Sequence, residues 1–192
     1  MIPRYALLRR VLHWIVAVLV IGMIPGGLIF TEFDNRDAIE GLFGAGSFNR
    51  FYDLHKSVGV VVLALMAARV GAMLVWPAPA RTPPLSPPVR LAATVSHAAL
   101  YVLLIVTPLL GWAGVSAFRA PIPVFGFFEM PPIAPQDREL SRWLLDLHSA
   151  CAFAIAALVT IHVAAAFWHR NVREDTVFYR IGFGRRRPTP GE

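Results

Sequence analysis

The sequence predicts an all-α membrane protein, a bundle of four transmembrane helices. Three observations support this fold class. The 192 residues are 56% hydrophobic and only 16% charged, whereas soluble domains carry about 25% charged residues. The apolar residues gather in four long segments, each close to the roughly 20 residues that cross a hydrocarbon core. Polar or proline-rich stretches separate the segments, as expected for connections between helices.

The expected spans are residues 7–30, 54–76, 95–118 and 144–168. The first connection is polar at residues 34–37. The second, residues 77–88, is rich in proline and is expected to be a stiff, extended strap. The third covers residues 119–139. We therefore expect one transmembrane domain over residues 1–180, followed by a basic, disordered cytoplasmic tail at residues 181–192.

The distribution of basic residues predicts that both chain termini lie in the cytoplasm. With this orientation, most of the 18 Lys and Arg residues fall at the cytoplasmic ends of the spans, in the second connection or in the tail. An excess of Lys and Arg marks the cytoplasmic side of membrane proteins. Anionic lipid of the inner leaflet accounts for the net charge of +6, so membrane lipid is the expected partner and nucleic acid is not.

Four histidines lie inside the apolar segments, and the predicted topology sorts them by depth. His148 and His162 are 14 positions apart in the fourth span, which on a helix is a rise of about 21 Å and nearly a whole number of turns. His55 and His148 are then expected near the outer surface, and His13 and His162 near the inner surface. Because a titratable side chain inside a bilayer is costly and is usually functional, the two pairs indicate two stacked cofactor sites.

Haem is the cofactor that two imidazoles suit. Zinc sites take three or four protein ligands, whereas a haem needs protein ligands only at its two axial positions. The sequence has one cysteine, Cys151, and no Cys-x-x-Cys-His, so the haem is expected to be b-type and held non-covalently. Four basic residues near the two layers are candidates for haem propionates or, equally, for interfacial cations: Arg10, Lys56, Arg69 and Arg142.

Three residues at the cytoplasmic ends of the third and fourth spans admit two interpretations. His97 opens the third span, and Trp168 and His169 close the fourth. They form either part of a quinone or proton site, or an interfacial group of water-exposed histidines beside an aromatic-belt tryptophan.

The chain resembles the bacterial cytochrome b561 family of four-helix, di-haem membrane cytochromes. The resemblance covers about residues 4 to 180 and is carried by ordered motifs: Leu12-His13-Trp14, His55-Lys56-Ser57-Val58-Gly59, Ser96-His97, Pro108-Leu109-Leu110-Gly111-Trp112, Leu147-His148 and Ile161-His162-Val163-Ala164. It implies two b haems bound by His13, His55, His148 and His162. It also implies a multi-pass protein of the bacterial inner membrane that exchanges electrons with ubiquinone. One branch of the family oxidises superoxide.

The leading hypothesis is a di-haem cytochrome that moves electrons between a donor on the outer side, superoxide being one candidate, and ubiquinone. The outer side carries more acids than bases, so attraction of superoxide would depend on a local field from Lys56, Arg50, Arg119 or Arg142. The alternative is a membrane-anchor subunit that passes electrons from a partner redox enzyme to the quinone pool. A haem-free transporter with the histidines as a proton relay is a third hypothesis, and it requires a colourless protein.

Overall fold

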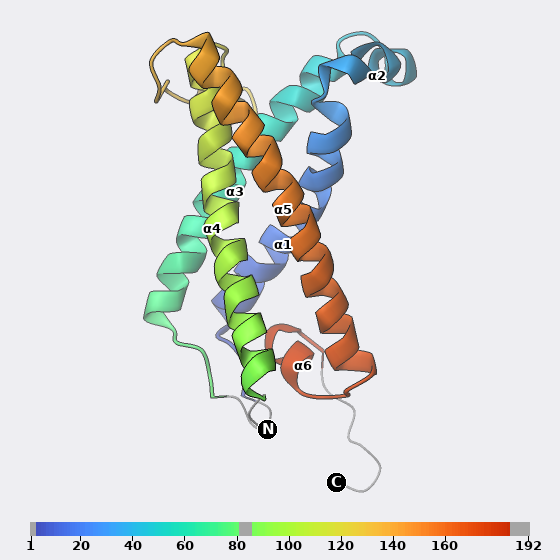
Figure 1. Ribbon diagram of the computed structural model, residues 1–192, viewed down its shortest axis with the longest axis vertical. Coiled ribbons are helices and arrows are strands. Elements are labelled where there is room, and N and C mark those ends of the chain that lie inside the picture. Colours follow the sequence, from blue (N-terminus) through green and yellow to red (C-terminus); the bar gives the residue numbers. More distant parts are fainter. Residues whose placement is uncertain (1–2, 81–85, 185–192) are drawn as a thin grey trace, which may run out of the picture.

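Four long helices run the length of the computed structural model, which confirms the predicted all-α, four-span fold (Figure 1). The model describes residues 3–80 and 86–184. The spanning helices are α1 (Leu7–Phe30), α3 (Ser47–Val75), α4 (Pro87–Phe118) and α5 (Arg138–Asn171). Each is apolar and long enough to cross a membrane.

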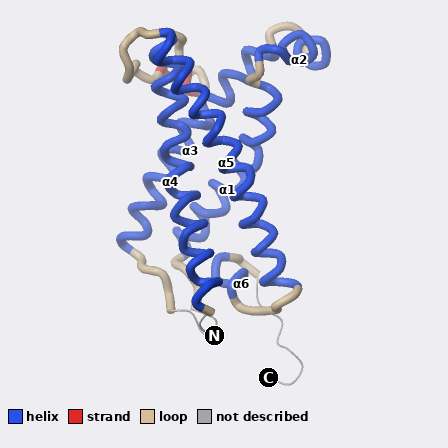
Figure 2. Tube along the Cα trace, viewed as in Figure 1, coloured by secondary structure: helices blue, strands red, loops and turns tan. Residues whose placement is uncertain are grey.

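The spanning helices pack mainly as two hairpins, α1 with α3 and α4 with α5, and α3 also contacts α4. Short elements mark the two ends of the bundle (Figure 2). We call the end with the first turn of α1 and the short helix α6 the terminal end. The end with the short helix α2 and the two strands is the hairpin end.

Three of the four spanning helices begin earlier than the apolar pattern indicates, because their first turns are polar. Helix α5 begins after Asp137, whose carboxylate accepts hydrogen bonds from the backbone N–H groups of Glu139 (2.8 Å) and Leu140 (3.0 Å). Helix α4 begins with Pro87 and Pro88, where a missing N–H removes no helical hydrogen bond. These two prolines therefore belong to a helix and not to the expected extended connection, of which residues 81–85 lie outside the described part of the chain.

The hairpin end holds small elements that the sequence did not predict. A 3₁₀ turn, Phe33–Asn35, leads into α2 (Arg36–Phe43). Between α4 and α5, strand β1 (Pro123–Val124) pairs antiparallel with β2 (Phe128–Glu129). Ser57 fixes this hairpin to α3, because its hydroxyl donates to the carbonyl of Pro123 (2.9 Å) and accepts from the N–H of Phe125 (3.0 Å).

The terminal end is closed by the segment that follows α5. Helix α6 (Val177–Ile181) and the residues after it pack on the start of α1. Arg10 donates to the carbonyl of Gly182 (2.7 Å), and the indole of Trp14 donates to that of Ile181 (3.1 Å). Residues 181–184 of the expected tail are thus in contact with the bundle, and residues 185–192 lie outside the described residues.

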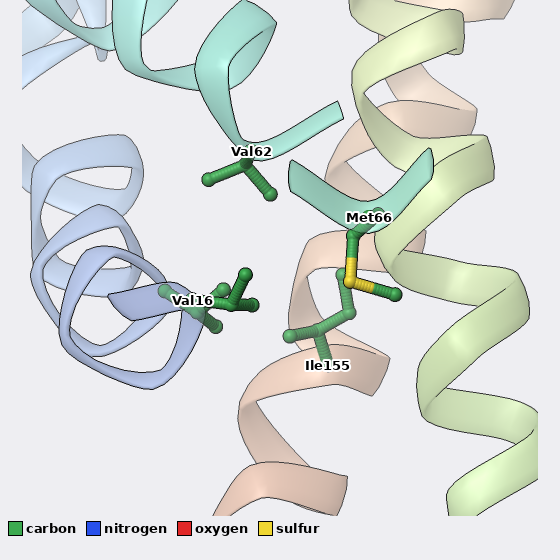
Figure 3. Close-up of a cluster of buried hydrophobic side chains, with 5 residues drawn as sticks. Val16, Val62, Met66 and Ile155 are labelled. Atoms are coloured by element: carbon green, nitrogen blue, oxygen red, sulfur yellow. The ribbon is translucent and has the colours of Figure 1, made fainter. Parts of the chain in front are cut away.

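The centre of the bundle is filled by a small group of buried apolar side chains, which we call the central apolar cluster. Its members come from three helices and point toward one another (Figure 3). Met66 is completely buried and Val16 is 1% exposed. The cluster consists of Val16 and Val20 of α1, Val62 and Met66 of α3, and Ile155 of α5. It forms a packed apolar layer at the middle of the bundle.

Helices α4 and α5 approach closely at Gly114, which yields a test of the packing. A Cβ at this position would lie 2.8 Å from Cγ and Cδ2 of Leu145, and the hydroxyl of Ser141 donates to the Gly114 carbonyl at 2.8 Å. We expect Gly114→Ala to lower the free energy of unfolding by about 1–3 kcal/mol, because overpacking forces the helices apart. Thermal unfolding in detergent measures this change. Gly71→Ala in α3, where a Cβ meets nothing within 4 Å, is the matched control, and equal melting temperatures for the two variants would contradict the packing argument.

Candidate functional site

The structure brings the four histidines of the apolar segments together as two pairs. The ring centroids of His55 (α3) and His148 (α5) are 6.1 Å apart, with 76° between the ring planes. The ring centroids of His13 (α1) and His162 (α5) are 6.3 Å apart, with 64° between the planes. The first pair lies toward the hairpin end and the second toward the terminal end. These are the pairs that the predicted topology proposed.

Helical periodicity explains why the paired side chains face the bundle interior. On α5, His148, Ile155 and His162 follow one another at seven-residue intervals, which is close to two turns and keeps them on one face. On α1 the same face carries His13, Val16 and Val20. The central apolar cluster therefore lies between the two pairs and separates them along the bundle axis.

The separation within each pair suits one metal ion bound between the rings. An ion about 2.0 Å from one nitrogen of each ring, with that nitrogen about 1.1 Å from its ring centroid, places the two centroids about 6 Å apart. Both observed separations agree with this value. In residues 3–80 and 86–184, no group of three or more His, Cys, Asp or Glu side chains is arranged to hold a metal. Two-ligand axial coordination thus fits the described residues better than a zinc-type site.

His148 is held by α4 in one orientation. Its Nδ1 lies 2.8 Å from the carbonyl oxygen of Thr107, to which it donates a hydrogen bond. Gly111, one turn further along α4, leaves room for this approach, because a Cβ there would lie 3.0 Å from His148 Nδ1. A histidine whose Nδ1–H is bonded in this way presents an unprotonated Nε2, the nitrogen that is free to coordinate a metal.

His55 faces a second glycine across the bundle. A Cβ on Gly27 of α1 would lie 3.2 Å from His55 Cε1. The Nδ1 atom of His55 is buried and makes no hydrogen bond to any described residue. A buried, unpaired ring nitrogen is costly unless a ligand satisfies the ring. This unsatisfied ring and the two glycine gaps fit a flat metal-bearing group between His55 and His148.

A cavity of about 300 Å³ opens beside this pair and has both rings in its wall. Its lining comes from all four spanning helices and is mostly apolar, with Val62 and Ile155 of the central apolar cluster among the contributing residues. The polar residues of the wall include Glu32, Tyr52 and Lys56 at the hairpin end. Cavities of this character, apolar with a few polar groups, are typical of small-molecule and cofactor sites.

The His13–His162 pair has different neighbours. Arg69 of α3 places a guanidinium nitrogen 3.3 Å from His13 Nδ1. The ring of His97 on α4 lies 5.2 Å from the ring of His162, centroid to centroid. Tyr101, one turn after His97, lies under the Arg69 guanidinium at 5.0 Å. Helix α4 thus contributes no member to either histidine pair but supports both of them.

The other predicted site residues separate into two groups. His97 is exposed and lies beside His162. His169 is buried, at 8% exposure, and its Nδ1 lies 2.5 Å from Oδ2 of Asp175, so it is not the water-exposed histidine of one interpretation. Trp168 stays partly exposed beside His169. Among the described residues, no hydrogen bond, ion pair or ring contact joins His97 to Trp168 or His169.

The four basic residues considered for propionates have distinct environments. Lys56 forms an ion pair with Asp53 (2.7 Å) and donates to the carbonyl of Pro121 (2.8 Å). Arg10 is occupied by the carbonyl of Gly182, and Arg142 is exposed. Arg69 is the member of this set that contacts a histidine of either pair within the described residues.

Sequence reasoning missed the residues that support the histidines. The carbonyl of Thr107 and the gap at Gly27 leave no distinctive pattern in the sequence. Pro108 and Gly111 belong to one motif of the third span, and the structure shows a close approach of His148 to Gly111. This approach depends on how α4 packs against α5, so the sequence alone does not identify His148 as the partner of Gly111.

Comparisons with known proteins match nearly the whole chain. The family model described as prokaryotic cytochrome b561 matches residues 4–184. Cytochrome b561 homolog 2 of Escherichia coli (strain K12) is 29% identical over 178 residues, covering 93% of this chain and 90% of that protein. A probable superoxide oxidase of Yersinia pestis is 27% identical over 179 residues, covering 93% and 95%. Cytochrome b562 of Cereibacter sphaeroides is 27% identical over 184 residues, also covering 93% and 95%.

The gap at Gly111 provides a test of how His148 is oriented. We expect Gly111→Val to push the imidazole away from the Thr107 carbonyl and to lower the haem content of the purified protein, because the added carbons occupy the space that the ring uses. A pyridine haemochrome assay measures haem per chain. Gly22→Val, at an exposed α1 position where a Cβ meets nothing within 4 Å, is the control. Full haem content in Gly111→Val would show that the close approach does not matter for binding.

Proposed function

The chain belongs to the prokaryotic cytochrome b561 family, and we propose that it binds two b-type haems, one between His55 and His148 and one between His13 and His162. Family membership makes it a multi-pass electron-transfer protein of the inner membrane that binds b-type haem. The single observation that carries the two-haem proposal is the pair of imidazole separations, 6.1 Å and 6.3 Å, at two depths of one bundle.

The chain's own residues would hold and insulate these groups. Each histidine pair would hold its haem through ring nitrogens from two different helices, and the hydrogen bond to the Thr107 carbonyl leaves the Nε2 of His148 unprotonated. The central apolar cluster excludes water between the two sites. A b haem bound in each site would supply a one-electron carrier. Because two histidines would hold each haem and leave no iron position open, a small electron donor would react at the edge of the group and not at the iron.

We propose that the terminal end faces the cytoplasm. The basic residues that support this orientation include Arg4, Arg9 and Arg10 at the start of α1 and Arg170 and Arg173 after the membrane-spanning part of α5. The His55–His148 site then faces the periplasm, and the His13–His162 site faces the cytoplasm. Electrons would enter at the first site and leave at the second.

Superoxide is a candidate donor because one relative is described as a probable superoxide oxidase. The charge at the hairpin end gives this anion little general attraction, since the Lys56 charge is paired with Asp53 at 2.7 Å. Glu32 in the cavity wall adds a negative charge. We therefore propose that oxidation of superoxide by this protein depends on its reactivity at the site more than on electrostatic attraction toward the site.

Ubiquinone is the proposed acceptor, and His97 is the best-placed residue for its site. The ring of His97 is exposed and lies 5.2 Å from the ring of His162, which puts a polar group at the lipid-accessible side of the cytoplasmic haem site. His169 is less suited because it is buried and ion-paired with Asp175. By contrast, His97, whose Nδ1 contacts the Ala93 carbonyl, keeps its ring exposed. Trp168 remains a secondary candidate through its partial exposure.

A membrane-anchor subunit is the second candidate function, and one feature of the hairpin end favours it. The β1–β2 hairpin exposes three aromatic side chains, Phe125, Phe127 and Phe128, of which Phe127 is 87% exposed. Such an apolar projection suits a partner protein that delivers electrons. Recovery of the cytochrome in a stable complex with a redox enzyme, with no activity of the isolated chain, would favour this function.

Single histidine variants test the proposed ligand pairs. We expect His148→Ala and His13→Ala each to retain one haem per chain, because each change removes one axial ligand of one site only. The measurements are a pyridine haemochrome count and a reduced-minus-oxidised spectrum. His169→Ala, outside both pairs, is expected to keep two haems. Loss of both haems, or of neither, in a variant whose helical circular dichroism is unchanged would contradict the pairing.

An assay of the isolated chain tests the proposed electron path. We expect the purified protein to reduce a soluble ubiquinone when superoxide is generated enzymatically, and we expect His97→Ala to raise the KM for quinone while haem content is unchanged. Arg36→Gln, which removes a surface ion pair with Glu40 at the opposite end and lies outside the cavity wall, is the control. Unchanged quinone kinetics in His97→Ala would remove this residue from the proposed site.

A further inference from the structure

The two histidine pairs differ in the fixed charge that surrounds them. We propose that Arg69 raises the redox potential of the His13–His162 site above that of the His55–His148 site and so makes it the electron acceptor of the pair. This inference rests on the proposed haem ligation. It adds a direction of electron flow and names the residue that sets it.

Arg69 is placed beside the His13–His162 pair by contacts from two other helices. Its guanidinium nitrogen lies 3.3 Å from His13 Nδ1 of α1, and its guanidinium carbon lies 5.0 Å from the ring centroid of Tyr101 of α4. It is only partly exposed and lies six residues before the end of α3, a rise of about 9 Å along the helix. A cation at such a depth in a spanning helix is costly and usually has a functional reason.

The charge of Arg69 is not balanced by a nearby acid. Among the described residues, no carboxylate lies within ion-pair distance of its guanidinium. Arg10, one turn before His13, adds a second positive charge whose partners are the Gly182 carbonyl and the ring of Phe183. At the other site, the Lys56 charge is paired with Asp53 at 2.7 Å. The net fixed charge is therefore more positive around His13 and His162.

The hydrogen bond of His148 acts in the same direction as this charge. Reduction of a metal site adds one negative charge, which a fixed cation stabilises in a medium of low dielectric constant, so Arg69 raises the potential of the nearer site. His148 instead donates its Nδ1–H to the Thr107 carbonyl, which makes the imidazole a stronger donor and favours the oxidised state. The potential of the His55–His148 site is therefore the lower of the two.

This order of potentials drives electrons from the hairpin end to the terminal end. In each step one electron leaves the His55–His148 site and enters the His13–His162 site, and no bond is made or broken. Two such electrons, with two protons taken from the cytoplasmic side, reduce one quinone to quinol. The central apolar cluster lies between the two sites, so Arg69 is much nearer to the His13–His162 site than to the other site and acts mainly on the nearer one.

Redox titration of Arg69 variants tests the proposal. Arg69→Gln and Arg69→Lys are introduced into the His148→Ala chain, which is expected to hold only the His13–His162 haem, and the midpoint potential is measured by spectroelectrochemistry. We expect Arg69→Gln to lower the potential and Arg69→Lys, which keeps the charge, to stay near the parent value. Arg9→Gln removes a charge from the same end, where Arg9 donates to the Trp76 carbonyl, and serves as the control. Its potential should match that of the parent chain.

The possible outcomes distinguish this inference from the proposed function. An unchanged or raised potential in Arg69→Gln, or loss of its haem, overturns the role of Arg69 while the ligand pairs stand. A His148→Ala chain that holds two haems or none instead overturns the pairing itself. If the double variants do not fold, the two-component titration of the full chain with Arg69→Gln alone replaces them. In that titration the higher-potential component must shift downward and the lower one must not.

Discussion

The seven-residue spacing of His148, Ile155 and His162 on α5 is the constraint on which the rest of the structure depends. Because seven residues are close to two helical turns, these three side chains face the bundle interior at intervals of about 10 Å. One histidine from α1 and one from α3 meet the two ends of this series. Val16, Val62 and Met66 meet its centre (Figure 3). The bundle is therefore two histidine sites separated by one apolar layer.

Helix α4 makes the two sites unequal. At one site, the Thr107 carbonyl accepts a hydrogen bond from His148, and Gly111 provides the space for it. At the other, Tyr101 packs under Arg69, and His97 lies beside His162. An inequality of this kind is what a directional electron carrier requires, since two identical sites would give no preference for either direction. Helix α4, which supplies no histidine to either pair, thus makes the contacts that distinguish the two sites.

The sequence was sufficient for the large features of the fold and for the histidine pairs, because both follow from regular spacing. Hydropathy located the four spans, and helical rise together with topology paired His55 with His148 and His13 with His162. The sequence did not predict α2, the β1–β2 hairpin or the burial of His169 by Asp175, because these depend on contacts between segments. The sequence also did not predict the hydrogen bond from His148 to the Thr107 carbonyl, because every residue has a backbone carbonyl.

The most direct test of the central claim is the electron paramagnetic resonance spectrum of the oxidised, purified protein, combined with haem stoichiometry. Two bis-histidine sites predict two haems per chain and low-spin ferric signals, with no high-spin component. Two distinct signals are expected because the two pairs differ in neighbours and in the angle between ring planes, 76° and 64°. A single haem per chain, or a dominant high-spin signal from an iron with an open axial position, would contradict the account.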